Sequence, residues 1–407
     1  MQQVKALQQE TVELREKVRA LESGQMVTAQ SPATSADSHE VPGQVSAQTT
    51  APAAPTAPSD APREAPSDIH EVRGIQWKGF GEADYKVLDQ RRPETGAYGF
   101  VPGSAGNFYT GDFDLFLSSR LNDKAYVIGD VALEEGDAQS FKIDLRQALL
   151  KYDVNDHLRI SFGRYQTDIG YYNWAFRSAA WMQTTADRPL VLEYASNGGL
   201  LPTQAVGVSL TGLVPSGKLG LNYVAEYGSS DTIRPDINGS GLLNDENDGN
   251  HVLLGLFARP GAIPGLQIGG SYFHDKISDS EAGPSVRYAQ TIVNGYVVYI
   301  SHSIEFLNEV FLIRHSLIGG ARVFNTPAFY SQFSRKVGPI RPFVRYQYVN
   351  ASSDTGIFND VLLRYGPSFG VRYDLNNYIA FKAQLDHTVR KGLPDLNGLH
   401  LQAAFAF

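Results

Sequence analysis

The last nine residues constrain the fold of this chain more than any other stretch. Their side chains alternate strictly between two faces, one with Leu399, Leu401, Ala403, Phe405 and Phe407, and the other with His400, Gln402, Ala404 and Ala406. Because a strand repeats every two residues, this pattern predicts a strand with one apolar face and one small or polar face. About sixteen such segments follow one another from Val72 onward, each near the ~10 residues that a tilted membrane-spanning strand needs. We therefore predict an all-β fold, a single closed antiparallel transmembrane β-barrel of about 16 strands.

The composition excludes several classes of protein. The chain has 407 residues, of which 42% are hydrophobic, and its mean hydropathy is −0.24. No run of about 18 apolar residues occurs, which excludes a helical membrane protein but not a barrel, because a polar lumen face dilutes the apolar residues. The formal net charge of −8 gives no basic face, so we expect no nucleic-acid partner. Cysteine is absent, which excludes disulfides, a thiolate nucleophile and cysteine metal ligands.

Two segments precede the predicted barrel, which spans residues 71–407. Residues 1–22 follow a heptad pattern, with Val4, Thr11 and Val18 at a positions and Leu7, Leu14 and Leu21 at d positions. This spacing predicts a short coiled-coil helix that needs other copies of the chain, with a lone solvated amphipathic helix as the alternative; its β-branched a positions favour two strands over three. Residues 23–70 are rich in Ala, Pro, Ser and Thr and predict a disordered linker. No signal peptide is visible at Met1, so for an exported protein we expect a leader that was removed or lies upstream.

The connections between the predicted strands alternate in length. The even-numbered connections are short and lie near residues 121–124, 154–157, 215–217, 260–265, 301–303, 337–339 and 374–377. The odd-numbered ones are mostly longer and lie near 89–107, 135–140, 166–203, 231–250, 275–285, 315–320, 350–360 and 389–397. Bacterial barrels have short turns at one end and longer loops at the other, whereas the alternative, a soluble β-sandwich, has no reason to alternate. The pattern also places both termini at the short-turn end.

Three segments carry a resemblance to a known family. They are residues 112–124 (DFDLFLSSRLNDK), 145–152 (LRQALLKY) and 158–167 (LRISFGRYQT). With these segments the chain resembles bacterial outer-membrane porins, and within them the phosphate-selective porin (O and P) superfamily. The resemblance extends over about residues 72–407 and implies a sixteen-stranded, water-filled barrel that is often trimeric, with its third outer loop folded into the pore. The family's anion selectivity depends on arrays of arginine and lysine that are not matched residue by residue here, so the solute stays open.

The third outer connection, about residues 166–203, is a candidate constriction loop. A loop this apolar should not be fully exposed to water, and folding into the lumen would bury its aromatic rings. The candidate constriction residues are Asp168, Tyr171, Tyr172, Trp174, Arg177, Trp181 and Arg188. The alternative is an aromatic plug against the wall with its charges facing outward.

Charged side chains on the polar faces of the strands are a second candidate. Five predicted inward cations lie late in the chain, at Arg341, Arg345, Arg364, Arg372 and Lys382. Three predicted inward carboxylates lie on early strands, at Asp114, Asp130 and Glu134. Walls of opposite charge would produce a transverse field that sets ion preference. The alternative is a structural network in which the arginines pair with loop carboxylates.

These patterns predict a passive outer-membrane channel for small hydrophilic solutes or ions, with an anion bias left open. We expect contact with lipid and lipopolysaccharide, a homo-oligomer with a trimer favoured, and an N-terminal segment in the periplasm, where residues 1–22 could contact the cell wall. We expect no cofactor, metal or enzymatic activity, because the nine histidines show neither zinc spacing nor an evident serine partner. The first alternative is an envelope tether that uses residues 1–22, with the barrel as its anchor. The second is a secreted β-sandwich that binds a ligand.

Overall fold

The computed structural model describes most of the predicted barrel. The described residues are 70–72, 74–90, 105–135, 141–176, 179–193, 200–230, 250–278, 286–354, 357–358 and 361–407. The predicted coiled coil (residues 1–22) and the predicted linker (residues 23–70), apart from His70, lie outside them.

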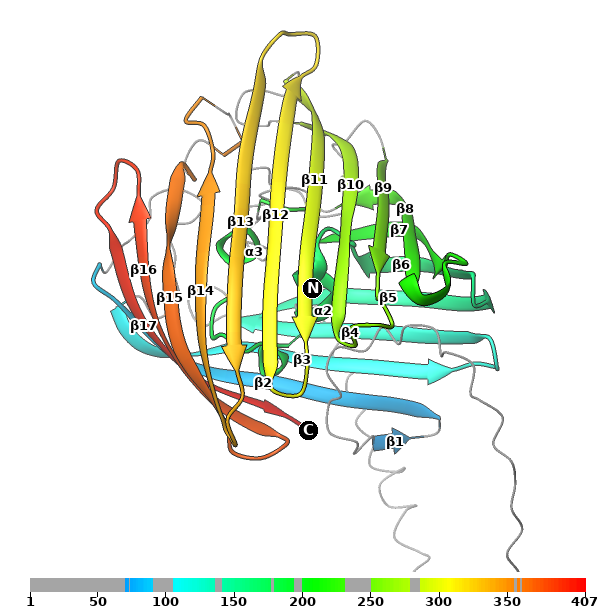
Figure 1. Ribbon diagram of the computed structural model, residues 1–407, viewed down its shortest axis with the longest axis horizontal. Coiled ribbons are helices and arrows are strands. Elements are labelled where there is room, and N and C mark those ends of the chain that lie inside the picture. Colours follow the sequence, from blue (N-terminus) through cyan, green and yellow to red (C-terminus); the bar gives the residue numbers. More distant parts are fainter. Residues whose placement is uncertain are drawn as a thin grey trace, which may run out of the picture. The chain divides into compact units, whose positions relative to one another are not determined.

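The described chain forms a closed antiparallel β-barrel, as predicted (Figure 1). The sheet has seventeen strands, of which sixteen form the wall and one, β1 (His70–Val72), is a short addition. The wall strands are β2 (Ile75–Leu88), β3 (Ala105–Arg120), β4 (Ala125–Glu135), β5 (Phe141–Asn155), β6 (Leu158–Gln166), β7 (Gln204–Leu213), β8 (Leu221–Ser230), β9 (His251–Ala258), β10 (Leu266–Ser278), β11 (Arg287–Ile300), β12 (Ile304–Leu317), β13 (Val323–Arg335), β14 (Ile340–Asn350), β15 (Leu363–Asp374), β16 (Ile379–Arg390) and β17 (Leu396–Ala406). The helical segments are α2 (Tyr171–Phe176), η2 (Ala180–Met182), α3 (Leu190–Glu193) and η4 (Gly217–Leu219).

The barrel closes where the last strand pairs with the first wall strand. Leu401 of β17 lies opposite Tyr85 of β2, and the pairing continues to the C-terminus. There the backbone N–H of Gly79 donates to the carbonyl of Phe407 at 2.8 Å, and the N–H of Phe407 donates back at 2.9 Å. A side chain at Gly79 would collide with the Phe407 ring, since an added Cβ would lie 2.1 Å from its Cζ atom. The glycine thus leaves room for the terminal ring to lie flat on the closing seam.

The two faces of the strands have the predicted orientation. On β17, Leu401 is 40% exposed, whereas His400 is 2% and Gln402 is 5% exposed. The same alternation follows β14 to β16, where the exposed apolar side chains include Val344, Tyr346, Phe369, Val371, Phe381 and Leu385. The outer surface is therefore apolar and the polar side chains point into the barrel, which is the arrangement a lipid-embedded barrel requires.

The short turns also lie where the alternation in length predicts, and three of them share one local mechanism. Asn122 accepts hydrogen bonds from the N–H groups of Lys124 and Ala125, both at 2.9 Å, and Asn376 does the same for Tyr378 and Ile379 at 2.8 Å. The Asn155 amide oxygen accepts from the N–H of His157 at 2.9 Å. An asparagine that bonds to the backbone two residues further on stabilises a tight turn.

We expect Leu401→Arg to destabilise the barrel, because a charge on the lipid face near mid-membrane costs about 2–4 kcal/mol. The free energy of unfolding by urea in lipid vesicles would measure this effect, with Leu401→Phe as an apolar control that stays near wild type. Equal stability of the arginine and phenylalanine variants would contradict the outward orientation of this face.

Candidate functional site

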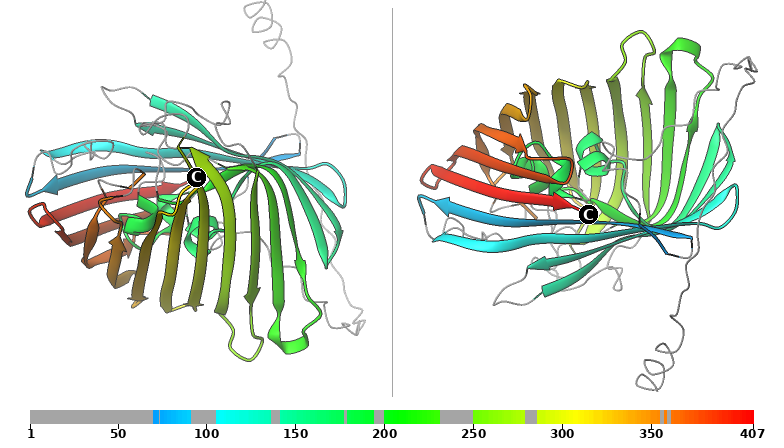
Figure 2. Two further views of the ribbon diagram at one scale, coloured as in Figure 1. Left: turned by 90° about the horizontal axis from the view of Figure 1, so that it is seen from above. Right: turned by 90° about the horizontal axis from the view of Figure 1, so that it is seen from below.

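The connection between β6 and β7 folds inside the barrel, as the sequence predicts. We call its described residues (167–176, 179–193 and 200–203) the inner loop. The loop contains α2, η2 and α3, which the strands surround in the views from above and below (Figure 2). Tyr172, Phe176 and Trp181 are buried, and the rings of Tyr172 and Phe176 lie 5.2 Å apart between centroids. The apolar side chains of the loop therefore pack with inward-facing wall side chains, such as Ile292 and Phe311, into one core inside the barrel.

A buried glutamate of the wall holds one end of the inner loop. The carboxylate of Glu309, on β12, accepts hydrogen bonds from the backbone N–H groups of Tyr171 at 2.6 Å and Tyr172 at 2.9 Å. The hydroxyl of Tyr330, on β13, donates to the same carboxylate at 2.5 Å. The first N–H groups of a helix have no partner within the helix, so Glu309 satisfies the start of α2.

Cations of β14 to β16 hold the middle of the inner loop by its backbone. Arg372 donates to the carbonyls of Trp181 at 2.6 Å and Gln183 at 2.8 Å. Lys382 donates to the carbonyls of Ala180 at 2.6 Å and Thr185 at 3.0 Å, and to the side chain of Gln402 at 2.7 Å. Arg345 donates to the carbonyl of Asp187 at 2.8 Å and to the Thr185 hydroxyl at 3.2 Å. An irregular buried segment lacks partners for its own carbonyls, and the wall supplies them here.

The five predicted inward cations therefore share an orientation but not a role. All five are buried and point into the barrel. Arg364 donates to the carbonyl of Val361, in the connection between β14 and β15, at 2.7 Å. Arg341 lies 3.4 Å from the Ser334 hydroxyl and 4.0 Å from Glu305. The structural network that we weighed as the alternative is present, but its acceptors on the inner loop are mainly backbone carbonyls, which no side-chain pattern reveals.

The three predicted inward carboxylates, Asp114, Asp130 and Glu134, do not form an open charged wall. They surround a buried arginine that sequence reasoning missed. Arg146, on β5, is 1% exposed and pairs with Asp114 and, at 2.9 Å, with Glu134. Asp130 is also buried and contributes to the charge around Arg146. The pairing of β4 with β5 shifts register beside Asp130. Simple alternation along the two strands therefore does not predict that Arg146 contacts these carboxylates. The only sequence signal was one inward arginine near several inward carboxylates.

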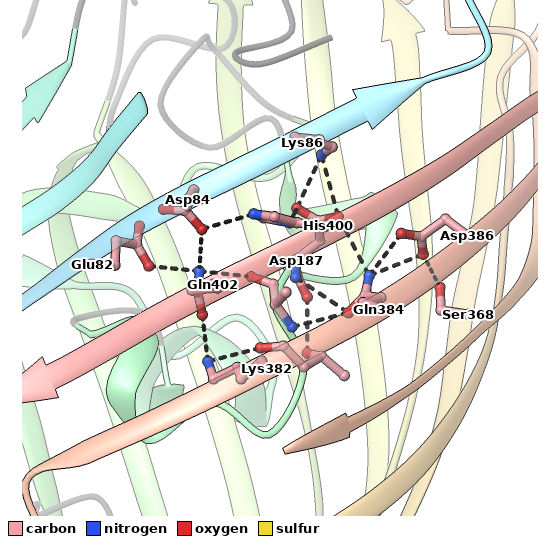
Figure 3. A network of polar contacts seen from close by, with 12 residues as sticks. Glu82, Asp84, Lys86, Asp187, Ser368, Lys382, Gln384, Asp386, His400 and Gln402 are labelled. Atoms are coloured by element: carbon pink, nitrogen blue, oxygen red, sulfur yellow. Dashed lines mark hydrogen bonds and ion pairs between the residues drawn. The ribbon is translucent and has the colours of Figure 1, made fainter. Parts of the chain in front are cut away.

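Asp187, which was not among the predicted site residues, ties the inner loop to the closing seam (Figure 3). Its carboxylate accepts from Lys86 of β2 at 3.1 Å and lies 2.9 Å from Nδ1 of His400 on β17. Burial alone would raise the pKa of Asp187, but the charges and hydrogen bonds of Lys86 and His400 hold it well below its usual range. The group is therefore a fixed anion that joins the loop to both strands of the seam.

Arg188, the next residue, bonds to a different part of the wall. Its guanidinium lies 3.2 Å from the carboxylate of Asp112 on β3, and both side chains keep some exposure, 16% and 20%. Asp187 and Arg188 therefore place opposite charges side by side on the loop while bonding to different strands.

The remaining predicted constriction residues are found in the inner loop, with one exception. Tyr171 packs on Trp174 with ring centroids 4.8 Å apart, and the guanidinium carbon of Arg372 lies over the Trp181 ring, 5.6 Å from its centroid. The backbone N–H of Asp168 donates to Glu226 of β8 at 3.2 Å. Arg177 lies outside the described residues. The structure thus brings the candidates together inside the barrel, and their contribution to a constriction stays a prediction.

In the part of the chain that the structure describes, no three side chains of His, Asp or Glu are grouped so that they could hold a metal ion. No helix there has the length and apolar character needed to cross a membrane.

Comparison with known proteins shows the class of fold. No protein-family model and no curated protein matches the chain. Among solved structures it is similar to an anion-selective porin from Comamonas acidovorans, with a TM-score of 0.57 and 12% identity over 82% of this chain and 99% of that one. The channel DcaP of Acinetobacter baumannii has a TM-score of 0.53 and 12% identity over 85% and 100% of the two chains. OmpT of Vibrio cholerae has a TM-score of 0.51 and 14% identity over 84% and 100%.

The chain therefore has the fold of outer-membrane porins, which confirms that level of the resemblance. The phosphate-selective superfamily within them stays a prediction.

We expect Arg372→Met to loosen the inner loop, because the carbonyls of Trp181 and Gln183 lose their charged donor at a cost of about 1–3 kcal/mol. Hydrogen exchange followed by mass spectrometry should show faster exchange in residues 180–187. Arg364→Met is the matched control, since Arg364 bonds to another connection. Equal protection of the inner loop in both variants would show that Arg372 does not hold it.

Proposed function

We propose that this protein is a passive channel of the bacterial outer membrane for small hydrophilic solutes. The observation that carries the proposal is the combination of an apolar outer surface with an inner loop that polar wall side chains hold inside the barrel. A barrel with this orientation places a polar interior across an apolar membrane, and the inner loop then sets the bore. The likeness in fold to porins and channels supports both the activity and the outer-membrane location.

The charges that hold the inner loop favour anions over cations in this proposal. Lys382 donates all three of its N–H groups to uncharged oxygens, and Arg345 donates to a carbonyl and a hydroxyl. The direct hydrogen-bond partners of both side chains are thus uncharged, while the carboxylates of Glu82, Asp84 and Asp187 lie close enough to Lys382 to interact with its charge. The Comamonas acidovorans structure is that of an anion-selective porin, which is consistent with such a bias here.

The predicted tether function rests on residues 1–22, which lie outside the described residues, and no observation of the described barrel favours it. The predicted trimer and the predicted cell-wall contact likewise stay proposals. The solute itself is left as a small hydrophilic molecule or anion.

Planar-bilayer recording of the purified protein tests the proposal. We expect stepwise ion conductance, and a reversal potential in a salt gradient whose sign shows that anions pass more readily. Arg188→Ala should shift the reversal potential toward cations, because it removes a partly exposed cation from the inner loop.

The matched control is Arg314→Ala, since Arg314 is an exposed arginine on the outer face of β12. A folded barrel that inserts but never conducts would contradict the channel. Equal reversal potentials for the Arg188 and Arg314 variants would remove Arg188 from the pore.

A further inference from the structure

His400, on the last strand β17, lies between two carboxylates, one from the inner loop and one from strand β2. Nδ1 of His400 lies 2.9 Å from the Asp187 carboxylate of the inner loop, and Nε2 lies 2.7 Å from the Asp84 carboxylate of β2 (Figure 3). The side chain of His400 is only 3% exposed. We call Asp84, His400 and Asp187 the His400 bridge.

The geometry of the His400 bridge fixes the charge of the ring. An ionised carboxylate has only acceptor atoms, so each ring nitrogen that faces one must carry a proton. An imidazole with protons on both nitrogens is a cation. Lys86 holds Asp187 from the other side, with Nζ 3.1 and 3.2 Å from its two oxygens, which keeps that carboxylate ionised. The bridge is therefore a row of alternating charges with the imidazolium in the centre.

The other charged and titratable groups around the bridge come from several elements. They are Glu82 and Lys86 on β2, Tyr109 on β3, Lys382 and Asp386 on β16, and the carboxylates of the bridge itself. The Tyr109 hydroxyl lies 3.2 Å from Nε2 of His400. Gln402 donates to Asp84 at 3.0 Å and to Glu82 at 2.8 Å. Carboxylates thus flank the ring on the β2 side and on the loop side.

Removal of the ring proton would weaken the hold on the loop. A neutral imidazole has one N–H and one lone pair, so one of the two carboxylates would then face a lone pair instead of a donor. Asp187 would keep Lys86 and a contact of 3.4 Å with the Gln384 amide, but it would lose an ionic partner. Stabilisation from the bridge is therefore present while the ring is protonated and is lost as pH rises through its titration.

We propose that His400 is a positioning residue that holds the inner loop against the closing seam and releases it at alkaline pH. The release moves Asp187, and with it the adjacent Arg188, away from the wall. The bore and the ion preference of the channel thus depend on pH through a side chain that need not touch the solute. This inference rests on the proposed channel function.

Single-channel conductance from neutral to alkaline pH tests the proposal. We expect the conductance of the wild-type protein to change by on the order of twofold as the ring loses its proton. His400→Gln should show the alkaline conductance already at neutral pH and should not change further. His387→Gln is the matched control, because His387 lies on the neighbouring strand β16, where its ring bonds to Asn397 away from the inner loop, and its pH profile should match wild type.

A second variant keeps the test independent of barrel folding. Asp187→Asn changes the inner loop and leaves every wall strand intact, and it should also abolish the pH response. A pH profile of His400→Gln or Asp187→Asn that follows wild type would overturn the proposal. Absence of conductance in the wild-type protein at every pH would instead overturn the channel function, so the two failures are distinguishable.

Discussion

The structure depends on one constraint, which is that every backbone group inside a membrane needs a partner from the protein. A sheet satisfies this only when its edges meet, and here they meet where β17 pairs with β2. The terminal residue takes part, since Phe407 and Gly79 exchange two backbone hydrogen bonds at the end of this seam. The seam also gathers Lys86, Asp84 and His400 on its inner side, so the place where the barrel closes is also one of the places where the inner loop is held.

The same constraint governs the inner loop. The loop is mostly irregular, and its backbone carries carbonyl and N–H groups that its own short helices do not use. Wall side chains of opposite character supply the partners: Glu309 accepts from the start of α2, whereas Arg372 and Lys382 donate to carbonyls further along. In the proposed channel, the charges near a passing ion would therefore be the same ones that hold the loop in place. Ion preference and loop position would then depend on a single network.

Much of this architecture follows from the sequence, for a physical reason. Strand periodicity is a local property, so the outward direction of Leu401 and Val344 and the inward direction of Arg345 could be read along the chain. The folding of the inner loop into the barrel also follows from its aromatic content. Contacts between distant segments of the barrel could not be predicted in this way. Asp187 meets Lys86 and His400 only once the strands have paired, and Arg146 meets its carboxylates beside a register shift. Backbone carbonyls that accept from Lys382 leave no trace in the sequence at all.

The absence of cysteine from the chain allows a direct test of the orientation on which the account rests. Single cysteines introduced at each position of β17, labelled with a fluorophore in lipid vesicles, would report quenching by lipid-bound quenchers. The account predicts strong quenching at positions 399, 401, 403 and 405 and weak quenching at 400, 402 and 404. Equal quenching along the strand, or strong quenching at position 400, would contradict it.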